Sequence, residues 1–260
     1  MLNIDTKKFI DKYRSLGLEV KTGIFSSNGI TSRYGIINDK STLPNLVFVH
    51  GAPGYLDEFR NYYRKTIIHH SFRILALERP GFGSSQPGKP ITNIAAQASH
   101  LGNLLQKTCL QPCYLLGHSY GGPISCKIAA DFPKIIRGLL LLAPALDPEL
   151  ELNFWTAHLV KTKLKPLIPL PLQTASNEKL VHASALKEIT PFYRKISQPI
   201  WYFHGKQDLI VPFANSDYAK REFVNADLTM TSLPFRNHFI NLFPPRQILE
   251  LLCQLATKST

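Results

Sequence analysis

The sequence predicts an α/β fold in which a mostly parallel sheet of eight strands carries helices on both faces. Short apolar runs alternate with helix-like segments through most of the 260 residues. The runs at 45–49, 73–77 and 136–142 are almost continuously apolar, which is typical of strands buried on both faces. Several runs end in loops that carry glycine and polar residues. Parallel sheets bind ligands at the carboxyl ends of their strands, so we expect the functional site at these loops.

The chain begins with a predicted helix and a hairpin that precede the parallel strands. Residues 3–16 carry apolar side chains at helical spacing, and Gly17 ends this pattern. Residues 18–25 and 31–37 each alternate like half-buried strands. The Ser-Asn-Gly sequence at 27–29 is a turn signal between them, so we expect an antiparallel hairpin.

After the hairpin, strands and helices alternate along the chain. We expect helices at 56–69, 91–107, 123–132, 213–223 and 245–255, and strands at 45–49, 73–77, 114–117, 136–142, 199–203 and 227–231. This order is typical of a parallel sheet with helices on both faces.

One stretch, residues 144–198, breaks the alternation. It contains no run that reads as a buried strand, and five prolines gather in its first half. They are Pro144, Pro148, Pro166, Pro169 and Pro171. Its apolar side chains are spaced as on short helices, and about 50 residues are too many for an ordinary loop. We therefore predict a core of residues 1–143 and 199–260, with a helical lid of residues 144–198 inserted between its two parts.

The sequence Gly-His-Ser-Tyr-Gly at 117–121 is the strongest functional signal. It lies between a predicted strand and a predicted helix, which is the context of a nucleophile elbow. At such a turn the backbone of Ser119 takes strained angles, and glycines at 117 and 121 remove side chains that would collide. The hydroxyl then stands at a helix N-terminus, which favours developing negative charge. We predict that Ser119 is a nucleophile.

A serine hydroxyl needs an adjacent base, and the base needs an orienting carboxylate. Where an elbow is present, the chain order is serine, then acid, then histidine. Asp208 follows the strand at 199–203, and His238 is the only histidine after Asp208. We therefore predict a triad of Ser119, His238 and Asp208. Asp147, which follows the strand before the insertion, is the alternative carboxylate.

Two backbone N–H groups complete the expected site. One belongs to Tyr120, the residue after the nucleophile, and the other to Ala52, in the loop at 50–54 that follows a buried strand. Pro53 has no N–H and cannot serve. We predict that Ala52 and Tyr120 form an oxyanion hole.

Five further residues are candidate substrate contacts. They are His50, Gly51, His118, Phe154 and Trp155. His50 and His204 both precede a glycine at a strand end, where bracing of the loop is the alternative role. His118 flanks the nucleophile and is equally placed to shape the elbow.

Together these motifs resemble those of the α/β-hydrolase superfamily, and in particular its lid-bearing small-molecule serine hydrolases. The resemblance rests on the loop at 50–54, the sequence Arg-Pro-Gly-Phe-Gly-Ser at 79–84, the elbow, residues 204–208 and His238. It implies the fold and the triad for nearly the whole chain. That branch includes esterases, lactonases, carbon–carbon bond hydrolases and proline iminopeptidases. Members with an aspartate nucleophile, the epoxide hydrolases and haloalkane dehalogenases, do not match a serine elbow.

We predict a cofactor-independent serine hydrolase that cleaves an ester, or a related acyl bond, of a small apolar substrate. A carbon–carbon bond hydrolase or an aminopeptidase of the same fold is the alternative. An aminopeptidase would need carboxylates in the lid to hold the substrate amine. Glu149, Glu151, Glu178 and Glu188 are available, although the ordinary interpretation of such residues is a solvated surface. A low-turnover ligand-binding protein or receptor on this scaffold is the alternative of another class.

Composition adds expectations about partners. The net charge is +12, but the basic residues are scattered and no nucleic-acid-binding motif accompanies them, so we expect no nucleic-acid partner. Contact with an anionic membrane through Lys161, Lys163 and Lys165 is the less favoured use of this charge. We find no signal-peptide pattern and no apolar run long enough to cross a bilayer, and we expect a cytoplasmic protein. Four cysteines without metal-ligand spacing predict reduced thiols and no metal site.

Overall fold

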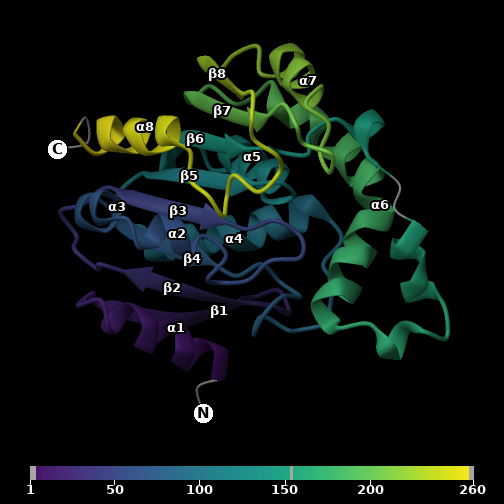
Figure 1. Ribbon diagram of the computed structural model, residues 1–260, viewed down its shortest axis with the longest axis horizontal. Helices are drawn as coiled ribbons and strands as arrows, with labels where there is room; N and C mark the ends of the chain where they lie inside the picture. Colours follow the sequence, from purple (N-terminus) through teal and green to yellow (C-terminus); the bar gives the residue numbers. More distant parts are fainter. Residues whose placement is uncertain (1–3, 153–154, 258–260) are drawn as a thin grey trace.

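In a computed structural model that describes residues 4–152 and 155–257, one sheet of eight strands runs through the protein (Figure 1). The strands are β1 (Val20–Ser27), β2 (Ile30–Ile37), β3 (Asn45–Val49), β4 (Arg73–Leu77), β5 (Cys113–His118), β6 (Ile136–Leu142), β7 (Ile200–Gly205) and β8 (Leu228–Leu233). Their order in the sheet is β1-β2-β4-β3-β5-β6-β7-β8. Strand β2 pairs antiparallel with β1 and β4, and the other pairs are parallel. The expected mostly parallel, eight-stranded sheet is confirmed.

Eight α-helices lie within the described residues. They are α1 (Ile4–Arg14), α2 (Arg60–Tyr63), α3 (Thr66–Ser71), α4 (Ile94–Thr108), α5 (Gly121–Asp131), α6 (Leu170–Tyr193), α7 (Asn215–Glu222) and α8 (Arg246–Thr257). Short 3₁₀ turns are η1 (Pro133–Ile135), η2 (Pro148–Leu150), η3 (Trp155–Lys161) and η4 (Lys165–Leu167). None of these helices is long and apolar enough to cross a membrane.

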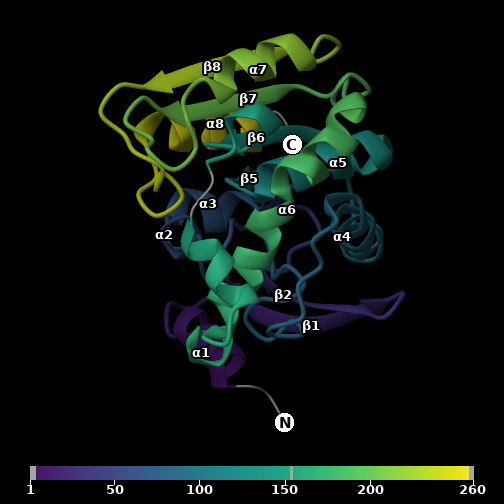
Figure 2. The ribbon, with the colours of Figure 1, turned by 90° about the vertical axis from the view of Figure 1, so that its right-hand side faces the viewer.

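The sheet separates two apolar layers because successive side chains of a strand point to opposite faces. On β3, Val47 packs with residues of α4, α5 and the C-terminal half of α6. Its neighbour Phe48 packs with residues of α1, α3 and α8. Figure 2 shows α4 and α5 on one side of the sheet and α3 and α8 on the other. Helices on both faces explain why the central strands are buried throughout and read as continuous apolar runs.

The hairpin and its turn agree with the sequence prediction. Asn28 and Gly29 both have positive φ, at 51° and 75°. Two positive values in a two-residue loop are those of the turn that Asn-Gly favours, and the twist of that turn matches the twist of the strands.

The single helix expected at 56–69 is wrong. Two short helices, α2 and α3, stand there instead, and Lys65 between them is extended, with φ of −74° and ψ of 120°. Tyr62, Tyr63 and Ile68 are all buried to 1% exposure or less. A straight helix would turn Ile68 about 140° away from Tyr63, so the break brings all three side chains to the core.

The segment 144–198 contains more regular structure than expected. The short helices that we predicted are present as η2, η3 and η4, but Leu170–Tyr193 forms one helix, α6, of 24 residues. Its two prolines explain why the sequence obscured it: Pro171 stands in the first turn, where no N–H is needed, and Pro191 stands near the end. The arrow of β3 points toward α6 (Figure 1), and α6 crosses in front of the sheet in Figure 2. The division into core and lid stays a prediction.

Candidate active site

Ser119 lies at a sharp turn between the end of β5 and the start of α5. Its φ is +52°, in the left-handed region that a serine rarely adopts. The Ser119 N–H donates to the carbonyl of Leu142 at 3.0 Å, which ties the turn to the end of β6. A Cβ on Gly117 would lie 2.5 Å from the Ser125 hydroxyl, and one on Gly121 would lie 2.3 Å from a backbone oxygen of Val49. The strained turn and its need for glycine are therefore as expected from the sequence.

Asp208 and His238 meet at the same edge of the sheet, in the loops that follow β7 and β8. The Nδ1–H of His238 donates to Oδ2 of Asp208 at 2.8 Å. Because Nδ1 carries the proton, the Nε2 atom of a neutral His238 is free to accept one. The Asp208–His238 link of the predicted triad is thus present as a hydrogen bond.

The carboxylate of Asp208 is held by three further donors. His204 Nε2 lies 3.2 Å from Oδ2, and the N–H groups of Ile210 and Val211 donate to Oδ1 at 2.9 and 2.8 Å. Nδ1 of His204 in turn accepts from the Tyr202 hydroxyl at 2.8 Å. His204 therefore braces this loop, which is the alternative role that its position before a glycine suggested.

The pKa values of His238 and Asp208 suit a general base and a permanently ionised carboxylate, respectively. Burial alone would raise the pKa of Asp208, but hydrogen bonds from His204, His238 and the Val211 N–H hold it well below its usual range. Burial lowers the pKa of His238 below its usual value, and the hydrogen bond to Asp208 offsets this only in part. At neutral pH His238 is consequently neutral and Asp208 is ionised.

The link between Ser119 and His238 is the weakest part of the geometry. In the part of the chain that the structure describes, no hydrogen bond joins the two side chains. Their loops are nevertheless tied together, because Nε2 of His118 donates to the carbonyl of His238 at 3.1 Å and the two rings are 4.8 Å apart. Catalytic hydrogen bonds often tighten only when substrate binds. The contact of Ser119 with its base stays a prediction.

The two proposed oxyanion donors flank Ser119. Ala52, Ser119 and Tyr120 line the same cavity, and a Cβ on Gly51 would lie 3.1 Å from that of Ser119. Among the described residues, no acceptor takes a hydrogen bond from the N–H of Ala52 or of Tyr120. Both N–H groups are therefore free for a ligand oxygen.

Three of the five candidate substrate contacts do not line the cavity at Ser119. His50 is 1% exposed and its ring nitrogens bond to backbone atoms of Gly51 and Arg79, so it braces the loop. His118 is 4% exposed and lies within hydrogen-bond distance of Glu58. Neither histidine, nor Gly51, lines the cavity at Ser119. Phe154 lies outside the described residues, and Trp155 begins η3 without a described side chain.

The alternative carboxylate, Asp147, has a structural role. Its Oδ1 accepts from the N–H of Glu149 at 2.9 Å and so caps η2, and its Oδ2 lies 3.7 Å from Arg221. It makes no hydrogen bond to His238.

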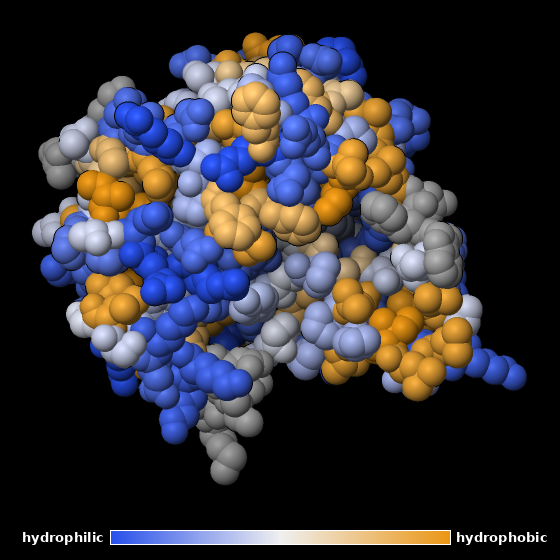
Figure 3. Space-filling view, viewed as in Figure 1, coloured by the Kyte–Doolittle hydropathy of each residue, from blue (hydrophilic) through white to orange (hydrophobic). Residues whose placement is uncertain are grey.

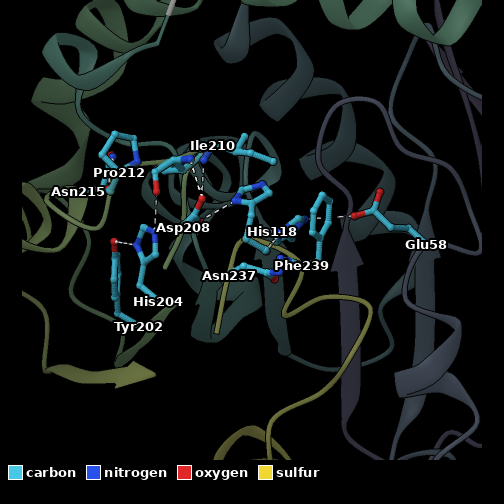
Figure 4. Close-up of polar contacts among 12 residues, drawn as sticks. Glu58, His118, Tyr202, His204, Asp208, Ile210, Pro212, Asn215, Asn237 and Phe239 are labelled. Carbon is cyan, nitrogen blue, oxygen red and sulfur yellow. Dashed lines mark hydrogen bonds and ion pairs between the residues drawn. The ribbon is translucent and has the colours of Figure 1, made fainter. Parts of the chain in front are cut away.

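Glu58 is a buried residue that the sequence did not single out. Its Oε1 accepts from Asn241 at 2.8 Å, and from the N–H of Gly51 at 3.4 Å, and it lies 3.3 Å from His118 Nδ1 (Figure 4). One carboxylate thus joins the loop after β3, the elbow and the loop of His238. Its place inside the helix expected at 56–69 carries no signal of this role.

The cavity at Ser119 has a volume of about 190 Å³ and mixes apolar with charged walls. Its lining residues are Ala52, Ser119, Tyr120, Ala145, Glu151, Thr156, Ala157, Leu172, Ala175, Ser176, Lys179, His182, Ile210 and Val211. Glu151 pairs with Lys179 and lies 2.9 Å from His182 Nδ1. Burial alone would raise the pKa of Glu151, but His182 and Lys179 lower it to about 2. This polar cluster contradicts the solvated interpretation for Glu151, whereas Glu149 and Glu188 are exposed, as that interpretation expects.

Glu178 contradicts that interpretation more strongly. It lies on α6 with no exposed side-chain surface, and it forms an ion pair with the fully buried Arg79. The Arg-Pro-Gly sequence pointed to the loop of Arg79, but nothing in the residue pattern of α6 indicated that Glu178 is its partner. Within residues 4–152 and 155–257, no group of three or more His, Cys, Asp or Glu side chains is arranged to hold a metal ion.

Comparisons with known proteins agree with the observed fold. Residues 44–165 match the model of a family described as having the alpha/beta hydrolase fold. The chain is 34% identical over 162 residues to "Lipase 3" of Moraxella sp. (strain TA144), covering 60% of this chain and 47% of that protein. It is 29% identical over 109 residues to the "sn-1-specific diacylglycerol lipase ABHD11" of Mus musculus, covering 42% and 35%. The chain thus spans less than half the length of these curated relatives.

Solved structures share the fold over almost the whole chain. A candidate aryl esterase from Burkholderia cenocepacia has a TM-score of 0.73 at 15% identity, covering 93% of this chain and 99% of that one. The haloalkane dehalogenase DatA from Agrobacterium tumefaciens C58 has a TM-score of 0.66 at 18% identity, with coverages of 93% and 97%. Because structures named for different reactions share the fold with TM-scores of 0.73 and 0.66, the likeness shows the fold and leaves the reaction to the residues of the site.

Proposed function

This chain belongs to the α/β-hydrolase superfamily, and from that premise we propose that it is a serine hydrolase that cleaves an ester or a related acyl bond. The observation that carries the proposal is the joint placement of three residue types. A strained Ser119 ends β5, an ionised Asp208 follows β7, and its hydrogen-bonded partner His238 follows β8. Strand ends of one parallel sheet bring them to one edge, beside a cavity lined by Ser119.

In the proposed mechanism, Nε2 of His238 takes the hydroxyl proton as Oγ of Ser119 attacks the acyl carbon and forms a tetrahedral intermediate. The N–H groups of Ala52 and Tyr120 stabilise its negative oxygen. His238 then gives the proton to the leaving group, which departs as the intermediate collapses to the acyl-enzyme. Water, deprotonated by His238, attacks this ester, and His238 returns the proton to Oγ of Ser119 as the acid leaves. Asp208 keeps His238 in the Nδ1–H tautomer and stabilises its cation.

We propose that residues 144–198 act as the lid and set the choice of acyl group. They supply Glu151, Thr156, Ala157, Leu172 and the α6 residues of the cavity wall. A volume of about 190 Å³ fits a short acyl group better than a long chain. The apolar part of the wall supports an apolar acyl group, and the Glu151–Lys179 pair supports a polar substituent at its far end.

A lipid ester is the second candidate substrate, because apolar side chains gather on the outside of this segment. Leu164, Leu167 and Leu170 are 51%, 79% and 47% exposed, and Lys161, Lys163 and Lys165 stand among them. Figure 3 shows the apolar surface at the lower right. Exposed apolar groups rimmed by basic residues suit an anionic lipid surface. Two relatives with lipase names support this candidate.

Labelling with a fluorophosphonate tests the proposal. This reagent phosphonylates only an activated serine, so the protein should react and Ser119→Ala should not. Ser125→Ala is a matched control, because Ser125 is buried one turn along α5 and bonds to the carbonyl of Gly121. Folded protein that stays unlabelled would instead support the ligand-binding alternative.

A substrate panel separates the remaining alternatives. Purified protein should hydrolyse p-nitrophenyl acetate or butyrate faster than p-nitrophenyl palmitate if the cavity selects a short acyl group. Preference for the palmitate ester in anionic vesicles would favour the lipid candidate. Turnover of aminoacyl amides, or of a vinylogous 1,5-diketone without any ester activity, would favour the aminopeptidase or the carbon–carbon bond hydrolase.

A further inference from the structure

Arg79 is a buried cation directly behind the proposed oxyanion loop. It follows the end of β4, and its side chain has no exposed surface. Its Nη1 donates to the carbonyl of Gly51 at 3.0 Å, and its Nε donates to Gln97 at 3.3 Å. Its Nη2 forms an ion pair with Glu178. A buried charge is costly even when paired, so its position calls for an explanation beyond packing.

The carbonyl that Arg79 holds belongs to the peptide group whose N–H is a proposed oxyanion donor. Gly51 C=O and Ala52 N–H are the two ends of one planar unit, and in a trans peptide they point in opposite directions. A donor fixed on the carbonyl therefore aims the N–H of Ala52 away from Arg79, toward the cavity that Ala52 and Ser119 line. A cation at the oxygen also polarises the amide and makes its N–H a stronger donor.

His50 holds the same carbonyl from a second direction. Its Nδ1–H donates to the Gly51 oxygen at 2.8 Å. Its Nε2 accepts from the backbone N–H of Arg79 at 3.0 Å, which fixes the tautomer. Arg79 and His50 therefore form one support, and the peptide between Gly51 and Ala52 cannot turn without losing two hydrogen bonds.

Arg79 also contacts the residue that supplies the second donor. Its guanidinium carbon lies 4.5 Å from the centre of the Tyr120 ring. The ring of His182 stacks on Tyr120 at 4.2 Å and 19°. At these distances the guanidinium of Arg79 and the ring of His182 cannot share one face of the Tyr120 ring. They therefore lie on opposite faces, and the Tyr120 ring is held between them. Both donors of the oxyanion hole thus depend on the same arginine.

The charge of Arg79 is balanced from outside the β-sheet core, by α6. Glu178 has no exposed surface, and its Oε1 also accepts from Gln97 Nε2 at 2.9 Å. Gln97 accepts from Arg79 through its other amide atom. Arg79, Gln97 and Glu178 therefore close a buried network that joins β4, α4 and α6.

We propose that Arg79 is a positioning residue that aims and polarises the Gly51–Ala52 peptide as an oxyanion donor, and that Glu178 makes the 144–198 segment part of this device. The inference rests on the proposed serine hydrolase function. Arg79 touches no substrate atom in this account, and it acts through the peptide that it holds. The lid would then contribute to the chemical step as well as to the choice of substrate.

The test replaces the ion pair by two neutral amides, as Arg79→Gln with Glu178→Gln, because removal of one partner alone would leave an unpaired buried charge. The matched control is Arg73→Gln with Asp39→Asn. Arg73 starts the same strand, is 4% exposed and pairs with Asp39 at 2.6 Å, but it lies at the far end of β4. Thermal melts of both variants would check that they fold.

We expect the Arg79/Glu178 variant to lose about 10- to 100-fold in kcat on p-nitrophenyl butyrate, with KM within about threefold, because a loosened donor loses part of what a deleted donor costs. The inhibition constant of phenylboronic acid, which forms a tetrahedral adduct with the serine, should rise by the same factor, while that of the product butyrate should not. The control should keep kcat within about twofold.

Unchanged kcat and unchanged boronate affinity in the folded Arg79/Glu178 variant would overturn the inference while leaving the proposed function standing. Equal losses in both double variants would also overturn it, because the effect would then be general destabilisation. If the unmodified protein neither hydrolyses esters nor reacts with a fluorophosphonate, the proposed function fails, and the inference fails with it.

Discussion

Asp208→Asn replaces one carboxylate oxygen by an amide NH₂ in a site where both oxygens accept. Oδ2 faces the N–H groups of His204 and His238, and Oδ1 faces the backbone N–H groups of Ile210 and Val211. The NH₂ must therefore oppose donors in either orientation. On the Oδ1 side it would leave two backbone donors unpaired, at about 1–3 kcal/mol each. On the Oδ2 side His238 can relieve the conflict by moving its proton from Nδ1 to Nε2.

The orientation with the NH₂ on the Oδ2 side costs less free energy, and it leaves His238 unable to act as the base. With the proton on Nε2, His238 cannot accept one from Ser119. We expect kcat near neutral pH to fall by about 10³- to 10⁴-fold, a loss of about 4–5.5 kcal/mol of transition-state stabilisation. The assay is steady-state hydrolysis of p-nitrophenyl butyrate, with a thermal melt to confirm folding.

Asp147→Asn is the control, because Asp147 is a buried aspartate that caps η2 and lies at the end of the neighbouring strand. Its activity should stay within about twofold of the unmodified protein. A folded Asp208→Asn variant with more than a tenth of normal activity would refute the reasoning. So would an inactive Asp147→Asn variant beside an active Asp208→Asn variant.

Three further predictions concern pH and the backbone. In the pH profile of kcat/KM, the midpoint of the acid limb should lie below pH 6.5, because burial lowers the pKa of His238 and only neutral His238 accepts a proton. A midpoint above pH 6.5 would contradict this. The pKa of Glu151 is lowered to about 2, so its stabilisation is full above the unfolded-state pKa near 4.5 and is lost as pH falls toward 2. Urea unfolding should therefore show Glu151→Gln costing about 1–3 kcal/mol at pH 6 and almost nothing at pH 2, and a cost independent of pH would count against the assignment. Gly121→Ala should lower the free energy of unfolding by more than about 3 kcal/mol and abolish labelling of Ser119, because its Cβ would lie 2.3 Å from the Val49 carbonyl oxygen. The control Gly17→Ala places no atom within 4 Å of the new Cβ, so it should cost only about 1 kcal/mol, from its positive φ. Equal costs for the two variants would be inconsistent with a steric role.

The sheet could be predicted from the sequence because burial on both faces leaves a strong pattern. Strands β3, β4 and β6 have the expected bounds, and the others differ by a few residues at their ends. The helices at 56–69 and 170–193 were harder, because tertiary packing decided the first and two prolines obscured the second. Lys65 is extended so that Ile68 can reach the core, and no local signal marks that break.

The candidate triad could be read from the order of strand ends, since a parallel sheet brings these ends together whatever the loops do. The residues that support the triad could not be predicted in this way. The contacts Arg79–Gly51, Arg79–Glu178 and Glu58–Asn241 join residues 28, 99 and 183 positions apart in the chain, and such pairings leave no periodic or local trace. Buried acids and bases that carry no motif are thus where sequence reasoning about this site fell short.

Trapping the acyl-enzyme tests the central claim most directly. The protein would be mixed with p-nitrophenyl butyrate, quenched in acid within milliseconds, digested and analysed by mass spectrometry. We expect a butyryl group on the peptide that contains Ser119, present in the Ser125→Ala control and absent from Ser119→Ala. A butyryl group found only on another residue, or full turnover by Ser119→Ala, would contradict it.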